Sequence, residues 1–150
     1  MVTILIVDDC RNLRLLYEHE LEEEGYRVLL AEDSCQAVAQ LHAHAPDVAV
    51  VEIEGRGAGL DLIRALRKFR EDLPIVVNTG RSDVLNRGLK LVDACILKSS
   101  DLQCLKTAVR ALARGPAACS VSQNRLYGIS QSIFTSNMTP SQEDSYAQDS

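Results

Sequence analysis

Hydrophobic residues up to Gly115 fall into five short, nearly continuous runs, separated by segments with a different spacing. The runs are rich in Val, Ile and Leu and scarcely alternate with polar residues, which is typical of strands that are buried on both faces of a parallel sheet. They predict strands at Thr3–Asp8, Arg27–Ala31, Asp47–Glu52, Pro74–Asn78 and Ala94–Leu97.

Between these runs, apolar residues recur at intervals of three and four, which predicts amphipathic helices. The residues expected on their buried faces are Leu13, Leu16, Tyr17 and Leu21 in the first helix, Ala37, Val38 and Leu41 in the second, Leu62, Ile63, Leu66 and Phe69 in the third, and Leu102, Leu105, Val109 and Leu112 in the fifth. Alternating strands and helices predict right-handed crossovers and a doubly wound α/β sheet.

Capping residues and breakers mark where these helices begin and end. The first should stop at Gly25, and the second should be capped by Asp33 or Ser34 and end before Pro46. The fourth, less clearly patterned, should begin near Ser82, and the fifth should run from about Asp101 to Gly115 and Pro116. Residues 1–115 are therefore expected to form one domain.

The composition changes after this domain, because residues 116–150 are rich in Ser and Gln. We interpret them as a tail or linker. The alternative is a short helix around Gly128–Phe134 that docks on the domain or on a partner.

Composition and charge narrow the class of protein. The net charge of −5 and the pI of about 5.2 argue against direct nucleic-acid binding. No apolar run approaches the ~20 residues needed to span a membrane, and no leader pattern opens the chain, which predicts a cytoplasmic protein. The odd number of cysteines without C-x-x-C spacing favours small buried thiols over zinc or disulfides: Cys10, Cys35, Cys95, Cys104 and Cys119.

Polar residues with complementary chemistry follow four of the predicted strands. Asp8 and Asp9 end the first, Glu52 ends the third, Thr79 follows the fourth, and Lys98 follows the fifth. Ligands of doubly wound sheets bind at the carboxyl ends of the strands. Carboxylates there suit Mg²⁺, while a lysine with a hydroxyl suits the oxygens of a phosphoryl group.

Three segments make the chain resemble the receiver domain of two-component response regulators over about residues 2–115. They are "ILIVDD" with Asp8 and Asp9, "VVNTG" with Thr79, and "DACILKSSD" with Lys98. The resemblance implies a flavodoxin-like, five-stranded parallel sheet in the order 2-1-3-4-5 with five helices. It also implies phosphoryl transfer from a histidine kinase to an aspartate, aided by a metal and the lysine. Phosphorylation would reposition the face made by the fourth helix, fifth strand and fifth helix.

The chain departs from this family at functional positions. Glu52 stands where the phosphorylatable aspartate is expected, and the following "EIEGRGAGLD" has no proline and one residue fewer. Cys95 replaces the switch aromatic residue, and Ser99 replaces the proline after the lysine.

Glu52 is one methylene longer than aspartate, which moves its carboxylate by about 1.5 Å. A misplacement of ~1 Å can cost ~10²-fold in rate, so efficient phosphorylation of Glu52 is not expected. The glutamate could be an incomplete, permanent mimic of phosphate near Lys98 and Thr79, or an inert charge at a strand end. Because Cys95 offers little side chain to move, we favour a pseudo-receiver held in one conformation.

A metal site remains a tentative expectation. Asp8, Asp9, Glu52 and the carbonyl of Glu54 could hold Mg²⁺, weakly or not at all, since Glu52 could instead fill the metal position or pair with Lys98. Glu54 and Arg81 flank the expected mouth of the site, either as an ion pair or as two separately solvated charges.

These residues lead to a functional hypothesis with two rivals. The chain is expected to be a non-enzymatic protein–protein interaction module, a monomer or weak homodimer, with Val84, Leu85 and Leu89 in its partner face. The first rival is a phosphotransfer-competent receiver that uses a histidine kinase and Mg²⁺. The second, a flavodoxin-like cofactor-binding protein, is disfavoured because "DDCRNLR" would repel phosphate.

Overall fold

Five parallel strands form the centre of the protein, whose computed structural model describes residues 1–54, 59–85 and 90–113. Their order in the sheet is β2-β1-β3-β4-β5, which confirms the predicted doubly wound, flavodoxin-like arrangement. Each strand end lies within one residue of its predicted position. The strands are β1 (Thr3–Val7), β2 (Arg27–Ala31), β3 (Val48–Val51), β4 (Ile75–Thr79) and β5 (Ala94–Leu97).

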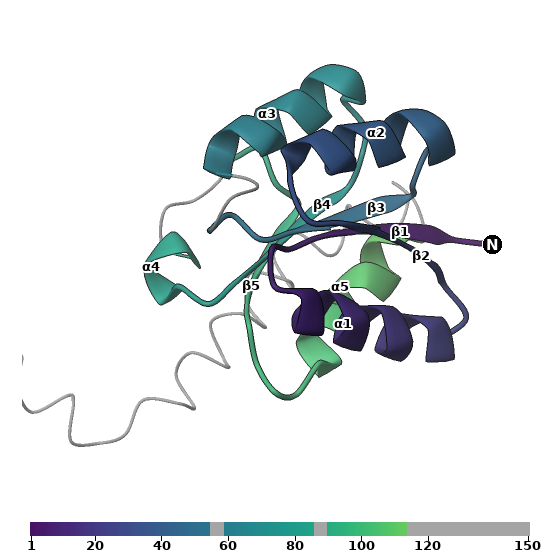
Figure 1. Ribbon diagram of the computed structural model, residues 1–150. Coiled ribbons are helices and arrows are strands. Elements are labelled where there is room, and N and C mark those ends of the chain that lie inside the picture. The colour runs from purple at the N-terminus through teal and green to yellow at the C-terminus, as the bar shows by residue number, and fades with distance from the viewer. Residues whose placement is uncertain (55–58, 86–89, 114–150) are drawn as a thin grey trace, which may run out of the picture.

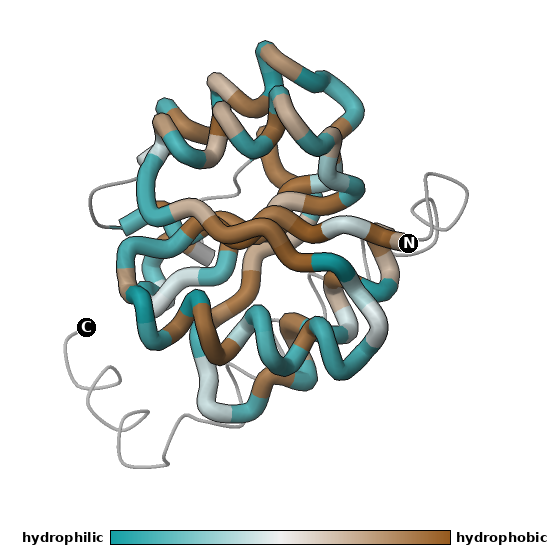
Figure 2. Tube along the Cα trace, turned by 45° about the vertical axis from the view of Figure 1, so that its right-hand side comes forward, coloured by the Kyte–Doolittle hydropathy of each residue, from teal (hydrophilic) through white to brown (hydrophobic). Residues whose placement is uncertain are grey.

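Helices cover both faces of this sheet (Figure 1). On one face lie α2 (Ser34–His44) and α3 (Gly59–Phe69), and on the other lie α1 (Arg11–Glu23) and α5 (Gln103–Ala113). Successive strand residues point to opposite faces, so β1 sends Leu5 to the α2/α3 side and Ile4 to the α1/α5 side. The hydrophobic centre of the tube in Figure 2 corresponds to these strands.

The predicted helix ends agree with the structure where it is described. Gly25 has a φ of 89° just after α1, a left-handed conformation that suits glycine. The side chain of Asp33 caps α2, because its Oδ1 accepts a hydrogen bond of 2.8 Å from the backbone N–H of Gln36. The short helix α4 (Ser82–Leu85) starts as predicted.

Three predictions for large apolar side chains were wrong. Leu16 and Phe69 are 41% and 47% exposed rather than buried. Leu16 lies about 100° around α1 from its buried neighbour Tyr17, and Phe69 is the last residue of α3, where its ring contacts the exposed His42 edge-on. Val84 was predicted to lie on a partner surface, but it is buried in the core.

Other predictions of burial hold only in part, and some predictions concern residues that the structure does not describe. Leu13, Val38 and Leu102 are only partly buried, and the thiols of Cys10 and Cys35 are exposed, which corrects the expectation of buried cysteines. Other expectations concern parts that lie outside the described residues. These parts are the end of the fifth helix, the tail at 116–150 with the helix around Gly128–Phe134, Cys119, and the side chains of Leu85 and Leu89. Within the described ranges, no helix has the length and apolarity to span a membrane.

Candidate functional site

Backbone pairing brings three charged residues to one edge of the sheet. Asp8, Glu52 and Lys98 are the first residues after β1, β3 and β5. Their backbone N–H groups donate to the last carbonyls of β2, β1 and β4, over 3.1, 2.8 and 2.7 Å. Each residue therefore extends the ladder of hydrogen bonds, and its position at the carboxyl edge is fixed by the sheet.

The side chains of these three residues meet in what we call the acid–lysine triad. The ammonium of Lys98 lies 2.7 Å from Oδ2 of Asp8 and 2.7 Å from Oε2 of Glu52. Both carboxylates are buried, while Lys98 is partly buried. Lys98 thus links β5 to β1 and β3 across the end of β4. The pairing of Glu52 with Lys98 is one of the alternatives that the sequence left open.

The other carboxylate oxygens of the triad also accept hydrogen bonds. Oδ1 of Asp8 accepts from the backbone N–H of Cys10 at 2.9 Å, and Oε1 of Glu52 accepts from the backbone N–H of Glu54 at 3.0 Å. All four oxygens therefore have a donor. Charge-assisted hydrogen bonds of this kind are about twice as strong as neutral ones, so the triad is a well-satisfied buried cluster.

The triad keeps Lys98 protonated. Burial of the ammonium lowers its pKa, but the hydrogen bonds and negative charges of Asp8 and Glu52 outweigh that effect and raise the pKa above its ordinary range. Lys98 is consequently a permanent cation at neutral pH.

The mouth of the site contains a second charged group. The ion pair between Glu54 and Arg81 is confirmed, with Nε of Arg81 3.2 Å from Oε1 of Glu54. The guanidinium also donates two hydrogen bonds of 2.8 and 2.9 Å to Asp83. Thr79 is buried below, where its hydroxyl oxygen accepts a hydrogen bond from the backbone N–H of Arg81. The mouth is therefore tied to Thr79 through the backbone.

The tentative Mg²⁺ ligands do not converge in this arrangement. Asp9 is exposed, and the side chain of Glu54 pairs with Arg81. In the part of the chain that the structure describes, no three His, Cys, Asp or Glu side chains are placed to hold a metal ion together. Carboxylate oxygens suit Mg²⁺ chemically; in this arrangement those of Asp8 and Glu52 are engaged by Lys98 and by backbone N–H groups.

The sequence analysis placed Tyr17 on a buried helix face and Asn78 at a strand end, but it did not predict the contact between them. Tyr17 on α1 and Asn78 on β4 are both buried, and their side chains are hydrogen-bonded to each other. Burial raises the pKa of the Tyr17 hydroxyl, while the bond to Asn78 and the charge of Lys98 lower it. The available signal was an amide at the end of an otherwise apolar strand, because a buried amide requires a partner.

Cys95, at the position where the resemblance implies a switch aromatic residue, is buried in β5. Burial, followed by the negative charge of Glu52, raises the pKa of its thiol to about 11. The thiol therefore stays neutral at physiological pH and contributes a small side chain to the α2/α3 layer.

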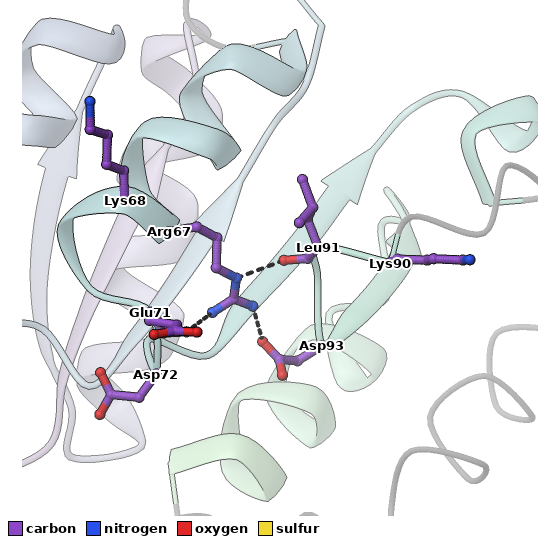
Figure 3. A pocket seen from close by; sticks show the side chains of 7 residues that line it. All are labelled: Arg67, Lys68, Glu71, Asp72, Lys90, Leu91 and Asp93. Carbon is purple, nitrogen blue, oxygen red and sulfur yellow. Dashed lines mark hydrogen bonds and ion pairs between the residues drawn. The ribbon is translucent and has the colours of Figure 1, made fainter.

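A different polar cluster lies at the amino ends of β4 and β5, beside an open cleft of about 670 Å³ (Figure 3). We call it the Arg67 clamp. The guanidinium of Arg67 is 2.8 Å from Oδ2 of Asp93, which also accepts from the backbone N–H of Ile75. It donates to three further carbonyls, those of Glu71, Leu73 and Leu91. The clamp joins the end of α3 to the starts of two strands.

The strand order and the residues at the carboxyl edge match a known family. Residues 4–110 match the family model described as "Response regulator receiver domain". This match covers most of the chain, and the chain therefore belongs to the response regulator receiver domain family. It is a signalling domain of two-component systems.

Curated relatives agree with this assignment. The response regulator MprA of Mycobacterium ulcerans is 37% identical over 117 residues, which cover 75% of this chain and 50% of the relative. MprA of Mycobacterium tuberculosis is also 37% identical over 117 residues, covering 75% of this chain and 51% of the relative. The chain thus spans about half the length of the curated relatives it matches.

Solved structures show the same fold. The response regulator TrrA of Thermotoga maritima, crystallised in complex with Mg²⁺-BeF, is 32% identical, with a TM-score of 0.68 over 75% of this chain and 99% of TrrA. A second match comes from a crystal structure of the histidine kinase ThkA in complex with TrrA. Its TM-score is 0.67 at 33% identity, covering 75% of this chain and 98% of that one.

Proposed function

We propose that this chain is an atypical receiver domain that signals by binding a protein partner, without phosphoryl transfer at the usual position. It acts in the cytoplasm as a binding module and not as an enzyme. The observation that carries the proposal is the engagement of Glu52, whose carboxylate contacts Lys98 at 2.7 Å and the backbone N–H of Glu54 at 3.0 Å.

This geometry works against nucleophilic attack by Glu52. In-line attack on phosphorus requires a carboxylate oxygen that is correctly placed and available. The extra methylene carries the Glu52 carboxylate about 1.5 Å beyond the aspartate position, and both of its oxygens already accept hydrogen bonds. A phosphoryl donor would first have to displace Lys98. The attacking oxygen of Glu52 would then still be misplaced for in-line attack.

The same contacts favour a single conformation. Lys98 ties β5 to β1 and β3, and Cys95 places only a small thiol where the family implies a moving aromatic ring. A switch needs two states that differ in their contacts with the signal. We therefore propose a pseudo-receiver that presents one constant surface, with Glu52 supplying a permanent negative charge.

We place the partner on the face made by α4, β5 and α5. The exposed residues of α5 are polar, namely Gln103, Thr107 and Arg110. Val84 of α4 belongs to the core, so it does not contribute an apolar group to this face. Thr107→Arg should abolish partner binding while the urea midpoint stays unchanged. A Thr107→Arg variant that still binds its partner at full strength would remove this face from consideration.

Binding of Mg²⁺ is proposed to be weak or absent, because the oxygens of Asp8 and Glu52 are already engaged by N–H donors. Residues 1–115 would form the signalling domain, and residues 116–150 would be a tail or linker.

The rival function is a phosphotransfer-competent receiver served by a histidine kinase. Two observations favour it: Asp8, Thr79 and Lys98 retain the places that the family implies, and the 33% identical TrrA was crystallised with a histidine kinase. Under this rival, Mg²⁺ would bind and Lys98 would move to a phosphoryl oxygen on the modified Glu52.

The two functions separate in one labelling experiment. The full chain and a Glu52→Asp variant are incubated with acetyl phosphate and Mg²⁺, and intact mass spectrometry follows a phosphoryl adduct over time. We expect the variant to gain the adduct, because it restores the shorter nucleophile, while the unmodified protein stays unlabelled. A stoichiometric adduct on Glu52 at the rate of the variant would overturn the proposal.

A further inference from the structure

We propose that Tyr17 is a positioning residue of the acid–lysine triad. By engaging the side-chain amide of Asn78, its hydroxyl keeps this amide from competing with Lys98 for the carboxylate of Glu52. The inference concerns how the triad is held in place, and it does not depend on whether Glu52 can accept a phosphoryl group.

Three polar residues lie side by side across neighbouring strands, and we call them the polar row. They are Asp8 after β1, Glu52 after β3 and Asn78 in β4. Each directly follows one of three valines that the register aligns, namely Val7, Val51 and Val77. These valines point to the α2/α3 layer, so the polar row points to the opposite layer, which contains α1 (Figure 1). Asn78 is therefore one strand spacing, about 4.8 Å, from Glu52.

Two polar groups flank the amide of Asn78. On β5 its neighbour in the register is Ile96, which is apolar. On β3 its neighbour is Glu52, and from α1 the hydroxyl of Tyr17 is hydrogen-bonded to the amide. Tyr17, Asn78 and Glu52 are only 3%, 4% and 5% exposed, so solvent has little access to them. The amide consequently depends on groups of the protein for its hydrogen bonds.

The hydroxyl of Tyr17 lies within electrostatic range of the triad. Burial has the largest influence on its pKa, and the charges of Lys98, Asp8 and Glu52 also act on it. Both carboxylate oxygens of Glu52 already accept a hydrogen bond, one of them from Lys98. Each such oxygen has two lone pairs and can accept a further donor. An amide released by Tyr17 would therefore find an acceptor that Lys98 already uses.

Loss of the hydroxyl should redirect the amide. In Tyr17→Phe the amide of Asn78 would be buried without its partner, which is unfavourable because the group has lost its contact with water. A hydrogen bond from the amide to the carboxylate of Glu52 removes this penalty, and bonds to a charged acceptor are about twice as strong as neutral ones. Lys98 would then share the carboxylate, and its own contact would weaken.

The test is nuclear magnetic resonance of the full chain, with EDTA present, on the unmodified protein, Tyr17→Phe, the double variant Tyr17→Phe/Asn78→Leu and a control, Tyr26→Phe. Leucine has nearly the shape of asparagine but forms no hydrogen bonds through its side chain. Tyr26 is a partly buried tyrosine of the same layer, and its hydroxyl interacts with Arg110. The readouts are the ¹⁵N signal of the Lys98 ammonium, recorded through carbon-bound hydrogens, and the side-chain amide signals of Asn78.

We expect Tyr17→Phe to move the Lys98 and Asn78 signals. Exchange of the ammonium hydrogens with water should become about fivefold faster, as expected for the loss of roughly one net hydrogen bond. The double variant should return the Lys98 signal to its position in the unmodified protein, because replacing both polar partners by apolar groups leaves no amide to compete. Tyr26→Phe should leave both signals in place.

An unmoved Lys98 signal in Tyr17→Phe would overturn the inference. A double variant whose Lys98 signal stays displaced would overturn it too, since the hydroxyl would then act through packing and not through Asn78. If Tyr17→Phe does not fold, the unmodified protein still decides the question. Its Tyr17 hydroxyl hydrogen should exchange slowly with water and show an Overhauser contact to the Asn78 amide, and a freely exchanging hydroxyl without this contact would refute the inference. A phosphoryl adduct on Glu52 would refute the proposed function and leave this inference standing.

Discussion

A partly buried cation lies at each end of the sheet, Lys98 at the carboxyl edge and Arg67 at the amino ends of β4 and β5. The two cations interact with different kinds of partner. The side chains of Lys98 and Arg67 are equally exposed, at 20%. Their partners are not, because the Asp93 side chain is 23% exposed, whereas those of Asp8 and Glu52 are 2% and 4% exposed. The two regions therefore differ in how deeply their carboxylates are buried, and not in the exposure of their cations.

The chemistry of the contacts differs as well. Arg67 distributes its N–H donors over backbone carbonyls and one carboxylate, which ties loops together in the way a structural clamp does (Figure 3). Lys98 binds two buried carboxylates, and the packing of the core does not by itself require that charged groups be buried there. Buried ionic clusters at the carboxyl edge of such sheets are typical of functional sites, which are commonly kept at some expense of stability.

Removing the lysine should give the largest effect. Lys98→Met leaves two buried carboxylates without a cation and should lower the free energy of unfolding by about 3 kcal/mol, near the lower end for a broken buried ion pair. Urea unfolding followed by far-ultraviolet circular dichroism, without Mg²⁺, measures the loss. Lys106→Met, whose carboxylate partners are more exposed, should lose much less. Equal losses in the two variants would break the comparison.

Removing the arginine should have a smaller effect. Arg67→Met leaves Asp93 with its bond from the Ile75 N–H and leaves carbonyls that water can reach, so we expect a loss of about 2 kcal/mol. Arg64→Met, an exposed arginine on the same helix, is the control and should change stability by less than about 0.5 kcal/mol. If Arg67→Met behaved like Arg64→Met, the clamp would have no structural role.

The sequence predicted one of these regions and missed the other, for physical reasons. Each residue of the triad directly follows a strand that a continuous apolar run identifies, and parallel strands bring such positions to one edge. Arg67 is placed by the end of a helix and by loop carbonyls, whose positions depend on loop conformation and leave no pattern in the sequence.

Side-chain orientation was the other limit. Helical spacing identified the buried stripe of α1 but placed Leu16 on it, because the spacing does not fix how wide the stripe is. It could not show that Val84, on a four-residue helix, turns into the core. The contact of Glu52 with Lys98 was one of several open alternatives, because a long glutamate arm can adopt several rotamers.

β5 connects the two regions, and its buried thiol provides a pH test of intermediate size. The pKa of Cys95 is raised from 9.0 to about 11 in the folded protein. Above pH 9.0 the unfolded chain releases this proton before the folded one, so the stabilisation is complete below pH 9.0 and is lost as pH rises toward 11. At about pH 10 the unmodified protein should therefore have lost roughly 1 kcal/mol through this group.

Cys95→Ala isolates that effect from other titrating groups. The difference in unfolding free energy between the unmodified protein and Cys95→Ala should be constant from neutral pH to 9.0 and then shrink. Urea titrations at a series of pH values measure it. A difference that stays constant throughout would mean that Cys95 ionises equally easily in the folded and unfolded chains.

The smallest effect is expected where charges lie at the carboxyl edge but remain exposed. Glu54 and Arg81 pair at the mouth of the site, with side chains 41% and 54% exposed. Solvent screens such a pair, and Arg81 retains Asp83 when Glu54 is neutralised, so Glu54→Gln should lower stability by at most about 1 kcal/mol, and by less in high salt. Asp61→Asn, which removes the exposed partner of Arg64, provides the matched control in the same urea assay. If Glu54→Gln cost as much as Lys98→Met, position at the edge of the sheet, rather than burial of the anion, would govern the energetics of both regions.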